Sequence, residues 1–350
     1  MPALNRRYDI DWVRVIAIGL LLVYHVAITF QPWGIMIGFI TNDTSWGSLW
    51  TPMTMLNVWR IPLLFYISGM GVYFALQNRD WKQLLRERTG RILVPFLFGA
   101  LIIVPIHIYL WQRYYAMGAG YRPDPGHLWF LGNIFIYILI TLPVLSLLKK
   151  YENSCFARWM KSMFKTPMGL LPILAAFIAE AIIIDPKPYE LYAMTWHGFF
   201  LGLVAFLSGF LFVFSGEIFW SMLLRWRWLF IAAAVALYIL RITYFNFNAP
   251  GYLLTLESNS WILSVFAFGH RYLNRPGRAL KYLSAAAYPV YIVHMAFLYL
   301  AAVLLFPLAI SAPVKFILVL LFTAAGCLIF YEFIIRRIKV VRMLFGLPAA

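Results

Sequence analysis

Charged residues are scarce in this chain. Only 12% of the 350 residues are charged and only 13 are acidic, whereas charged residues make up roughly 25% of an ordinary soluble domain. Apolar residues reach 63%, which is more than one water-soluble core of this length can bury. The composition therefore predicts an integral membrane protein, with lipid covering the apolar surface that remains.

The sequence also lacks the motifs of several enzyme classes. It has two cysteines, Cys155 in a basic loop and Cys327 in an apolar run, and neither setting indicates a disulfide or a metal site. No Cys/His cluster has metal spacing, no Gly-rich phosphate loop follows a strand, and no G-x-S-x-G turn presents a nucleophile. We expect no metal and no tightly bound cofactor, and a direct transfer with histidine as base fits these absences better than a covalent enzyme intermediate.

The scarce charges are mostly positive, with a net charge of +16. In a soluble protein this excess would suggest a nucleic-acid partner, but in a membrane protein the positive-inside rule accounts for it. We therefore predict a lipid bilayer as the surrounding partner and no nucleic acid.

Long apolar segments predict an all-α bundle of about ten transmembrane helices, because about 20 apolar residues are needed to cross a bilayer. The first segment follows Arg6 and Arg7 but has no small-x-small cleavage pattern, so we interpret it as an uncleaved span. No linker separates domains, and we predict a single membrane domain over residues 1–350. The predicted spans are 12–32, 52–76, 92–112, 128–148, 168–184, 197–215, 228–246, 258–273, 284–305 and 313–335.

The distribution of lysine and arginine tests this topology. With the amino terminus placed in the cytoplasm, the inner segments hold 22 Lys and Arg and the outer loops hold 4. Such a difference over short loops supports both the number of spans and the orientation. Both termini are predicted to be cytoplasmic.

Two polar residues in the first span are costly to keep in lipid. Arg14 and His25 are eleven residues apart, so they share one helix face with a rise of about 16 Å between them. Simpler interpretations remain open for each: Arg14 as an anchor at the membrane surface that pairs with Asp11, and His25 as a packing histidine.

Further polar residues are predicted at similar depths. Arg60 and His294 each lie about ten residues into their spans, which places them near the middle of the membrane and suggests a polar cavity with His25. Three more histidines fall near the outer ends of spans, where a role at the membrane interface is a simpler interpretation; these are His107, His127 and His197.

Two groups of basic residues lie on the predicted cytoplasmic side. They are either ordinary positive-inside charge or a site for a phosphorylated cytosolic ligand, since the arginine fork matches phosphate geometry. The groups are Arg86, Arg88 and Arg91, and Arg271, Arg275, Arg278 and Lys281. The tail RRIKVVRMLFG is predicted to form a short helix at the interface.

With these segments in order, the chain resembles the membrane acyltransferase 3 family. The resemblance rests on RVIAIGLLLVYH, an Arg-x10-His pattern from Arg14 to His25, together with YDIDWVRV, WRIPLLFYISGMGVYFAL, RERTGRILVP, HLWFL, VFAFGHRYLN, YPVYIVH and YEFIIRR. Within the family, the chain is most similar to members that succinylate periplasmic glucans. The resemblance implies about ten spans in a bacterial inner membrane, and transfer of an acetyl or succinyl group from cytosolic acyl-CoA to a hydroxyl of an extracytoplasmic glycan.

The resemblance also implies roles for residues. Arg14 and His25 correspond to the family's essential pair, and Arg88 and Arg91 to its paired arginines before the third span. From depth, we expect Arg60 or His294 to stabilise the oxyanion, Arg271 to help bind the donor, and His127 and Trp129 to bind the acceptor at the outer mouth.

Two other functions stay open from sequence alone. One is a transporter or flippase for a polar carbohydrate or acid, although no paired broken helices or inverted repeats are visible. The other is a non-catalytic scaffold, which would not explain Arg14 and His25 on one face. The sequence does not indicate an oligomeric state.

Overall fold

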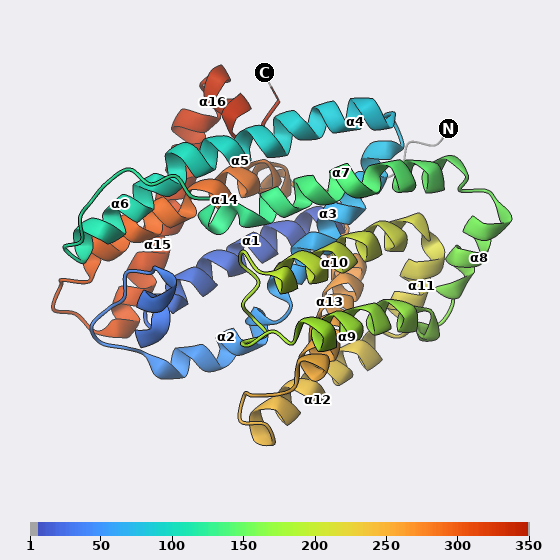
Figure 1. The fold of residues 1–350 in the computed structure, drawn as a ribbon, viewed down its shortest axis with the longest axis horizontal. Helices are drawn as coiled ribbons and strands as arrows, with labels where there is room; N and C mark the ends of the chain where they lie inside the picture. Colours follow the sequence, from blue (N-terminus) through green and yellow to red (C-terminus); the bar gives the residue numbers. More distant parts are fainter. Residues whose placement is uncertain (1–5, 349–350) are drawn as a thin grey trace. The chain divides into compact units, whose positions relative to one another are not determined.

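The computed structural model describes residues 6–348, and within them every regular element is helical. Eight helices are long and apolar enough to cross a membrane, and a ninth is possible if a bent pair counts as one span. The all-helical membrane fold is thus confirmed (Figure 1). The α-helices are α1 Tyr8–Ile28, α2 Trp50–Asn57, α3 Arg60–Leu76, α4 Trp81–Arg88, α5 Val94–Phe98, α6 Val104–Tyr114, α7 Trp129–Lys150, α8 Cys155–Met163, α9 Leu171–Ile184, α10 Trp196–Phe214, α11 Glu217–Arg225, α12 Arg227–Thr243, α13 Gly251–Tyr272, α14 Arg278–Leu305, α15 Ala312–Phe330 and α16 Lys339–Leu344.

Two of the ten predicted spans fall outside the eight: 228–246 in α12, which qualifies only as part of the bent pair of α11 and α12, and 258–273 in α13. Helix α13 has 22 residues and is long enough to cross a bilayer, but it is not among the helices apolar enough to qualify. Its polar side chains are turned inward, and Glu257, Ser258 and Asn259 are each at most 4% exposed. A helix that packs among α9, α11 and α12 need not be apolar on every face.

The second predicted span is interrupted, which the sequence analysis did not anticipate. Its helix stops after Asn57 and restarts at Arg60. Pro62 explains the break, because a proline ring clashes with the carbonyl four residues earlier, here that of Val58. The displaced Val58 carbonyl accepts a hydrogen bond from the Tyr192 hydroxyl at 3.1 Å, so a buried backbone group keeps a partner.

Other helices also depart from regular geometry. Residues Trp81–Tyr114 form one rod of 34 residues, which Figure 1 shows as the run α4, α5 and α6. The rod contains two π-helical segments, Thr89–Leu93 and Gly99–Ile103. Pro95 and Pro105 follow these segments and lack the amide proton of a regular helix. Helices α11 and α12 are bent by 61° relative to each other, and α16 confirms the predicted helix in the tail.

The chain forms two compact units. Unit 1 holds Met1–Ala17, Asn57–Arg86 and Asn133–Lys281, and unit 2 holds Ile18–Leu56, Glu87–Gly132 and Tyr282–Ala350. In unit 1, α3 packs along α10, and α13 packs on α9, α11 and α12. In unit 2, α16 packs on α5.

Candidate functional site

His25 and His294 form a hydrogen-bonded pair in unit 2. The Nδ1 atom of His25 lies 2.8 Å from Nε2 of His294, although 269 residues separate them in the chain. The two ring planes are almost parallel, with an angle of 3° between them and centroids 5.1 Å apart. His294 is 0% exposed, and its Nδ1 donates to the Tyr291 carbonyl at 2.6 Å. The structure thus joins two histidines that the sequence analysis placed at matching depth.

Two more histidines extend this pair. The His127 ring lies 4.9 Å from that of His294 and 5.6 Å from that of His107. His127 Nε2 donates to the Ile292 carbonyl at 3.1 Å, and the Tyr291 hydroxyl donates to the His127 carbonyl at 2.5 Å. The four histidines therefore form one cluster, which we call the histidine cluster: His25, His107, His127 and His294.

The histidine cluster retains unused hydrogen-bonding capacity. The Nδ1 atoms of His107 and His127 are buried, and neither has a hydrogen-bond partner among the described residues. No three His, Cys, Asp or Glu side chains within residues 6–348 are arranged to hold a metal ion. Because a neutral His127 that donates through Nε2 keeps a lone pair on Nδ1, this ring can accept a hydrogen bond from a hydroxyl.

Trp129 and His107 are more enclosed than depth alone predicts. Trp129 begins α7 and is 7% exposed, and His107 is 6% exposed. The sequence predicts Trp129 at an outer mouth and favours a position at the membrane interface for His107. In the structure both are interior side chains of unit 2.

Arg14 lies on α1, the same continuous helix as His25. Its guanidinium is 3.6 Å from Asp11 Oδ1, so the expected pairing with Asp11 is present but long. Asp11 has shorter contacts with Arg6, at 2.9 and 3.0 Å. Asp11 is therefore shared between two arginines.

Arg88 and Arg91 lie where α4 passes into the first π segment of unit 2. Arg88 is the last residue of α4 and is half-buried, while Arg91 lies in Thr89–Leu93 and is exposed. Arg91 pairs with Glu87 at 2.8 Å. The widened π turn changes the direction of the side chains that follow it, and such turns often occur at functional sites.

Besides Arg14, two predicted site residues belong to unit 1. Arg60 is the first residue of α3, directly after the helix break, and is 1% exposed. Arg271 lies in the last turn of α13 and is exposed. Burial of a complete arginine side chain confirms that Arg60 is an interior residue, as its predicted depth implied.

Comparison with known families identifies the chain. A family model described as an acyltransferase domain, that of the acyltransferase 3 family, matches residues 7–332. The chain belongs to the acyltransferase 3 family. The match covers every candidate residue named above, and it confirms the resemblance seen in the sequence. The chain is therefore a multi-pass membrane acyltransferase. No curated protein and no solved structure matches it.

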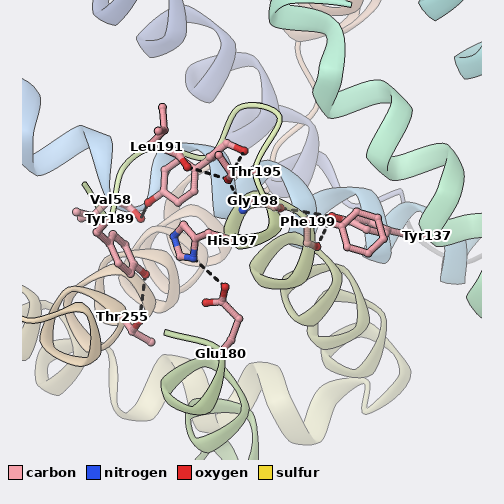
Figure 2. A network of polar contacts seen from close by, with 11 residues as sticks. Val58, Tyr137, Glu180, Tyr189, Leu191, Thr195, His197, Gly198, Phe199 and Thr255 are labelled. Carbon is pink, nitrogen blue, oxygen red and sulfur yellow. Dashed lines mark hydrogen bonds and ion pairs between the residues drawn. The ribbon is translucent and has the colours of Figure 1, made fainter. Parts of the chain in front are cut away.

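In this acyltransferase, unit 1 contains a buried polar network that the sequence analysis overlooked (Figure 2). His197 Nδ1 donates to Glu180 Oε1 at 2.8 Å, and the two side chains are 1% and 5% exposed. The rings of Tyr189 and Tyr192 lie 4.8 and 5.3 Å from that of His197. Glu180 is an acidic residue within an apolar predicted span, and this unusual position was the sequence feature that could have revealed the network.

Two further contacts complete this region of the acyltransferase. Burial raises the pKa of Tyr189, so its hydroxyl stays protonated and shares a hydrogen bond with Thr255 Oγ1 at 3.1 Å. Arg241 contacts Glu257 at 3.0 Å and Glu190 at 3.7 Å. Arg241 thus compensates the buried carboxylate of Glu257.

Proposed function

We propose that this acyltransferase moves an acetyl or succinyl group from cytosolic acyl-CoA to a hydroxyl of an extracytoplasmic glycan. We place it in a bacterial inner membrane with both termini in the cytoplasm, in accord with the distribution of basic residues. The observation that carries the proposal is His25, an imidazole held by a hydrogen bond inside the membrane segment of an acyltransferase. Imidazole is the side chain best suited to accept a proton near neutral pH.

The proposed reaction is a direct transfer. His25 accepts the proton of the acceptor hydroxyl while that oxygen attacks the thioester carbonyl. The new carbon–oxygen bond forms, the carbon–sulfur bond breaks, and the proton passes from His25 to the departing CoA thiolate. A general base of this kind contributes about 10²–10⁴-fold to the rate.

The donor is proposed to bind through its phosphates. Arg88 and Arg91 supply guanidinium groups beside a π turn, and Arg271 is a further basic residue with an exposed side chain. Arg14 is assigned to the pantetheine arm, because it lies about three turns from His25 on α1 toward the predicted cytoplasmic end. Arginine suits the role proposed for Arg88, Arg91 and Arg271, because its fork binds phosphate oxygens in pairs.

The acceptor and the acyl group are assigned to other residues. His127 keeps a lone pair on Nδ1, which suits a sugar hydroxyl, and Trp129 follows two residues later as the first residue of α7. We assign Arg60 to the carboxylate of a succinyl donor, because a buried cation stabilises that charge whereas an acetyl group carries none. Binding of acetyl-CoA and succinyl-CoA to wild type and to Arg60→Leu tests this assignment: loss of succinyl-CoA binding alone supports it.

The experiment for the main proposal uses the full-length protein in liposomes. Radiolabelled acetyl-CoA or succinyl-CoA is supplied on one side and a candidate glucan on the other, and both labelled glucan and free CoA are measured. We expect His25→Gln to lose about 10²–10⁴-fold in rate, Arg14→Ala to raise the donor KM, and the exposed-residue variant Lys187→Ala to match wild type.

Two results would contradict the proposal. Full activity in His25→Gln would show that His25 is not the general base. Passage of labelled carbohydrate or acid across the liposome membrane without CoA consumption would favour a transporter instead.

A further inference from the structure

His294 uses both of its ring nitrogens. Its Nδ1 lies 2.6 Å from the Tyr291 carbonyl and its Nε2 lies 2.8 Å from His25 Nδ1. A carbonyl oxygen only accepts hydrogen bonds, so Nδ1 of His294 carries a proton. In a neutral His294, Nε2 is then an acceptor. The hydrogen bond between the two rings therefore requires His25 to donate from its own Nδ1.

This assignment determines where His25 is basic. A neutral imidazole has one N–H and one lone pair, so a proton on Nδ1 leaves the lone pair on Nε2. The ring planes are parallel to within 3°, and with centroids 5.1 Å apart the two nitrogens at 2.8 Å lie on the line that joins the centroids. The hydrogen bond therefore lies close to the plane of both rings and also restrains the rotation of His25. His294 thus sets both the tautomer and the orientation of its partner.

The turn of α14 that contains the Tyr291 carbonyl, the acceptor for His294, is itself held by hydrogen bonds. The Tyr291 hydroxyl donates to the His127 carbonyl, and His127 Nε2 donates to the Ile292 carbonyl. These two reciprocal contacts tie one turn of α14 to the segment that begins α7. The Tyr291 carbonyl, which accepts the hydrogen bond from His294 Nδ1, therefore lies in a turn that these two contacts hold in place.

We propose that His294 is a positioning residue for acyl transfer, which makes Nε2 of His25 the base and stabilises His25 once it is protonated. This inference rests on the proposed function of His25. When the acceptor O–H bond breaks, the proton joins Nε2 of His25, and the Nδ1 proton stays in the hydrogen bond to His294. The proton on Nε2 then leaves with the thiolate, which restores the starting tautomer. Since both nitrogens of His294 are occupied in this way, we assign it no oxyanion contact.

Two substitutions at position 294 separate the functions of its nitrogens. A glutamine amide reaches about as far as Nε2 and can accept from His25, whereas an asparagine amide reaches about as far as Nδ1 and bonds only to the Tyr291 carbonyl. We expect His294→Asn to lose about 10²-fold in kcat, the lower end of a general-base contribution, with the donor KM unchanged. His294→Gln should keep most of the wild-type rate.

The coupling to His25 provides a second readout. If His294 acts through His25, adding His294→Asn to His25→Ala should cause no further loss, because residues that act as one unit are non-additive. In ¹⁵N spectra of histidine-labelled protein, the resonance lost in His25→Ala should report a proton on Nδ1 in wild type and in His294→Gln. It should show a mixture of tautomers in His294→Asn.

The outcomes separate the two proposals. Equal rates for His294→Gln and His294→Asn, in variants with the wild-type Tm, would overturn the role of His294 while His25 remained essential. An Nε2 proton on His25 in the wild-type spectrum would also overturn it. Full activity in His25→Ala would instead contradict the proposed function of His25, whatever the variants at position 294 showed.

Discussion

Gly69 of α3 lies so close to α10 that a Cβ added to it would be 1.8 Å from the Phe206 carbonyl oxygen. Gly209 of α10 approaches α3 in the same way, and its Cβ would be 1.9 Å from the Tyr66 carbonyl oxygen. Small residues allow helix backbones in membranes to approach closely, and packing drives their association there. In unit 1, the two glycines thus allow the backbones of α3 and α10 to pack in close contact.

Gly69→Ala should therefore destabilise the protein. A methyl group cannot fit at 1.8 Å from a backbone oxygen, so the helices must separate, at a cost of about 1–3 kcal/mol. The matched control is Gly71→Ala two residues later, where no atom lies within 4 Å of the added Cβ. It should leave the stability unchanged or raise it by up to about 1 kcal/mol. Thermal unfolding in detergent measures both, and equal Tm values would contradict the expectation.

Breaking the Glu180–His197 pair should be costly, because the partner left behind is buried and cannot reach water. We expect Glu180→Leu or His197→Phe alone to lower the free energy of unfolding by about 3 kcal/mol. The double variant should lose less than the sum of the two. Denaturant unfolding measures this cycle, and strictly additive losses would show that the pair contributes no coupling. The control is Lys187→Ala, which breaks the exposed pair with Asp185 and should cost at most about 1 kcal/mol.

Removing Arg91 should weaken donor binding and leave the chemical step intact. A hydrogen bond to a charged phosphate contributes about 1.5–3 kcal/mol, so Arg91→Ala should raise the acyl-CoA KM by about 10- to 100-fold with kcat unchanged. The exposed Arg122 provides the control variant, Arg122→Ala. With acyl-pantetheine, which lacks the nucleotide phosphates, wild type and Arg91→Ala should have the same KM. A lower kcat for both donors would instead place Arg91 in the chemistry.

Much of the site could be anticipated because polar groups in lipid are conspicuous. His25, His294 and Arg60 each stand out in an apolar run. In the structure His294 and Arg60 are buried and His25 is partly buried, although Arg60 begins α3 instead of lying inside a continuous helix. Their contacts could not be anticipated, since a hydrogen bond between residues 269 positions apart depends on how helices pack. The burial of His107 could not be predicted for the same reason, because distance from a span boundary does not show which neighbours cover a side chain.

Other errors had local signals that were not used. Pro62 marks the interruption before Arg60, and Glu180 marks the buried network around His197. Helix α13 was predicted as a span from its length and its apolar residues, but its polar residues exclude it from the helices that hydropathy identifies. In each case residues of unusual type carried more information than the average over the segment.

The inward-facing polar residues of α13 have a consequence for how the chain is made. Thr255, Glu257 and Asn259 contact Tyr189, Arg241 and Tyr66 respectively, and all three of these partners precede α13 in the sequence. A chain is synthesised from its amino terminus, so the partners are complete before α13 leaves the ribosome. When α13 inserts, the hydrogen-bonding partners of its polar side chains are therefore already in place. These side chains need not be exposed to lipid without a partner. Its insertion depends on the helices made before it rather than on its own hydropathy.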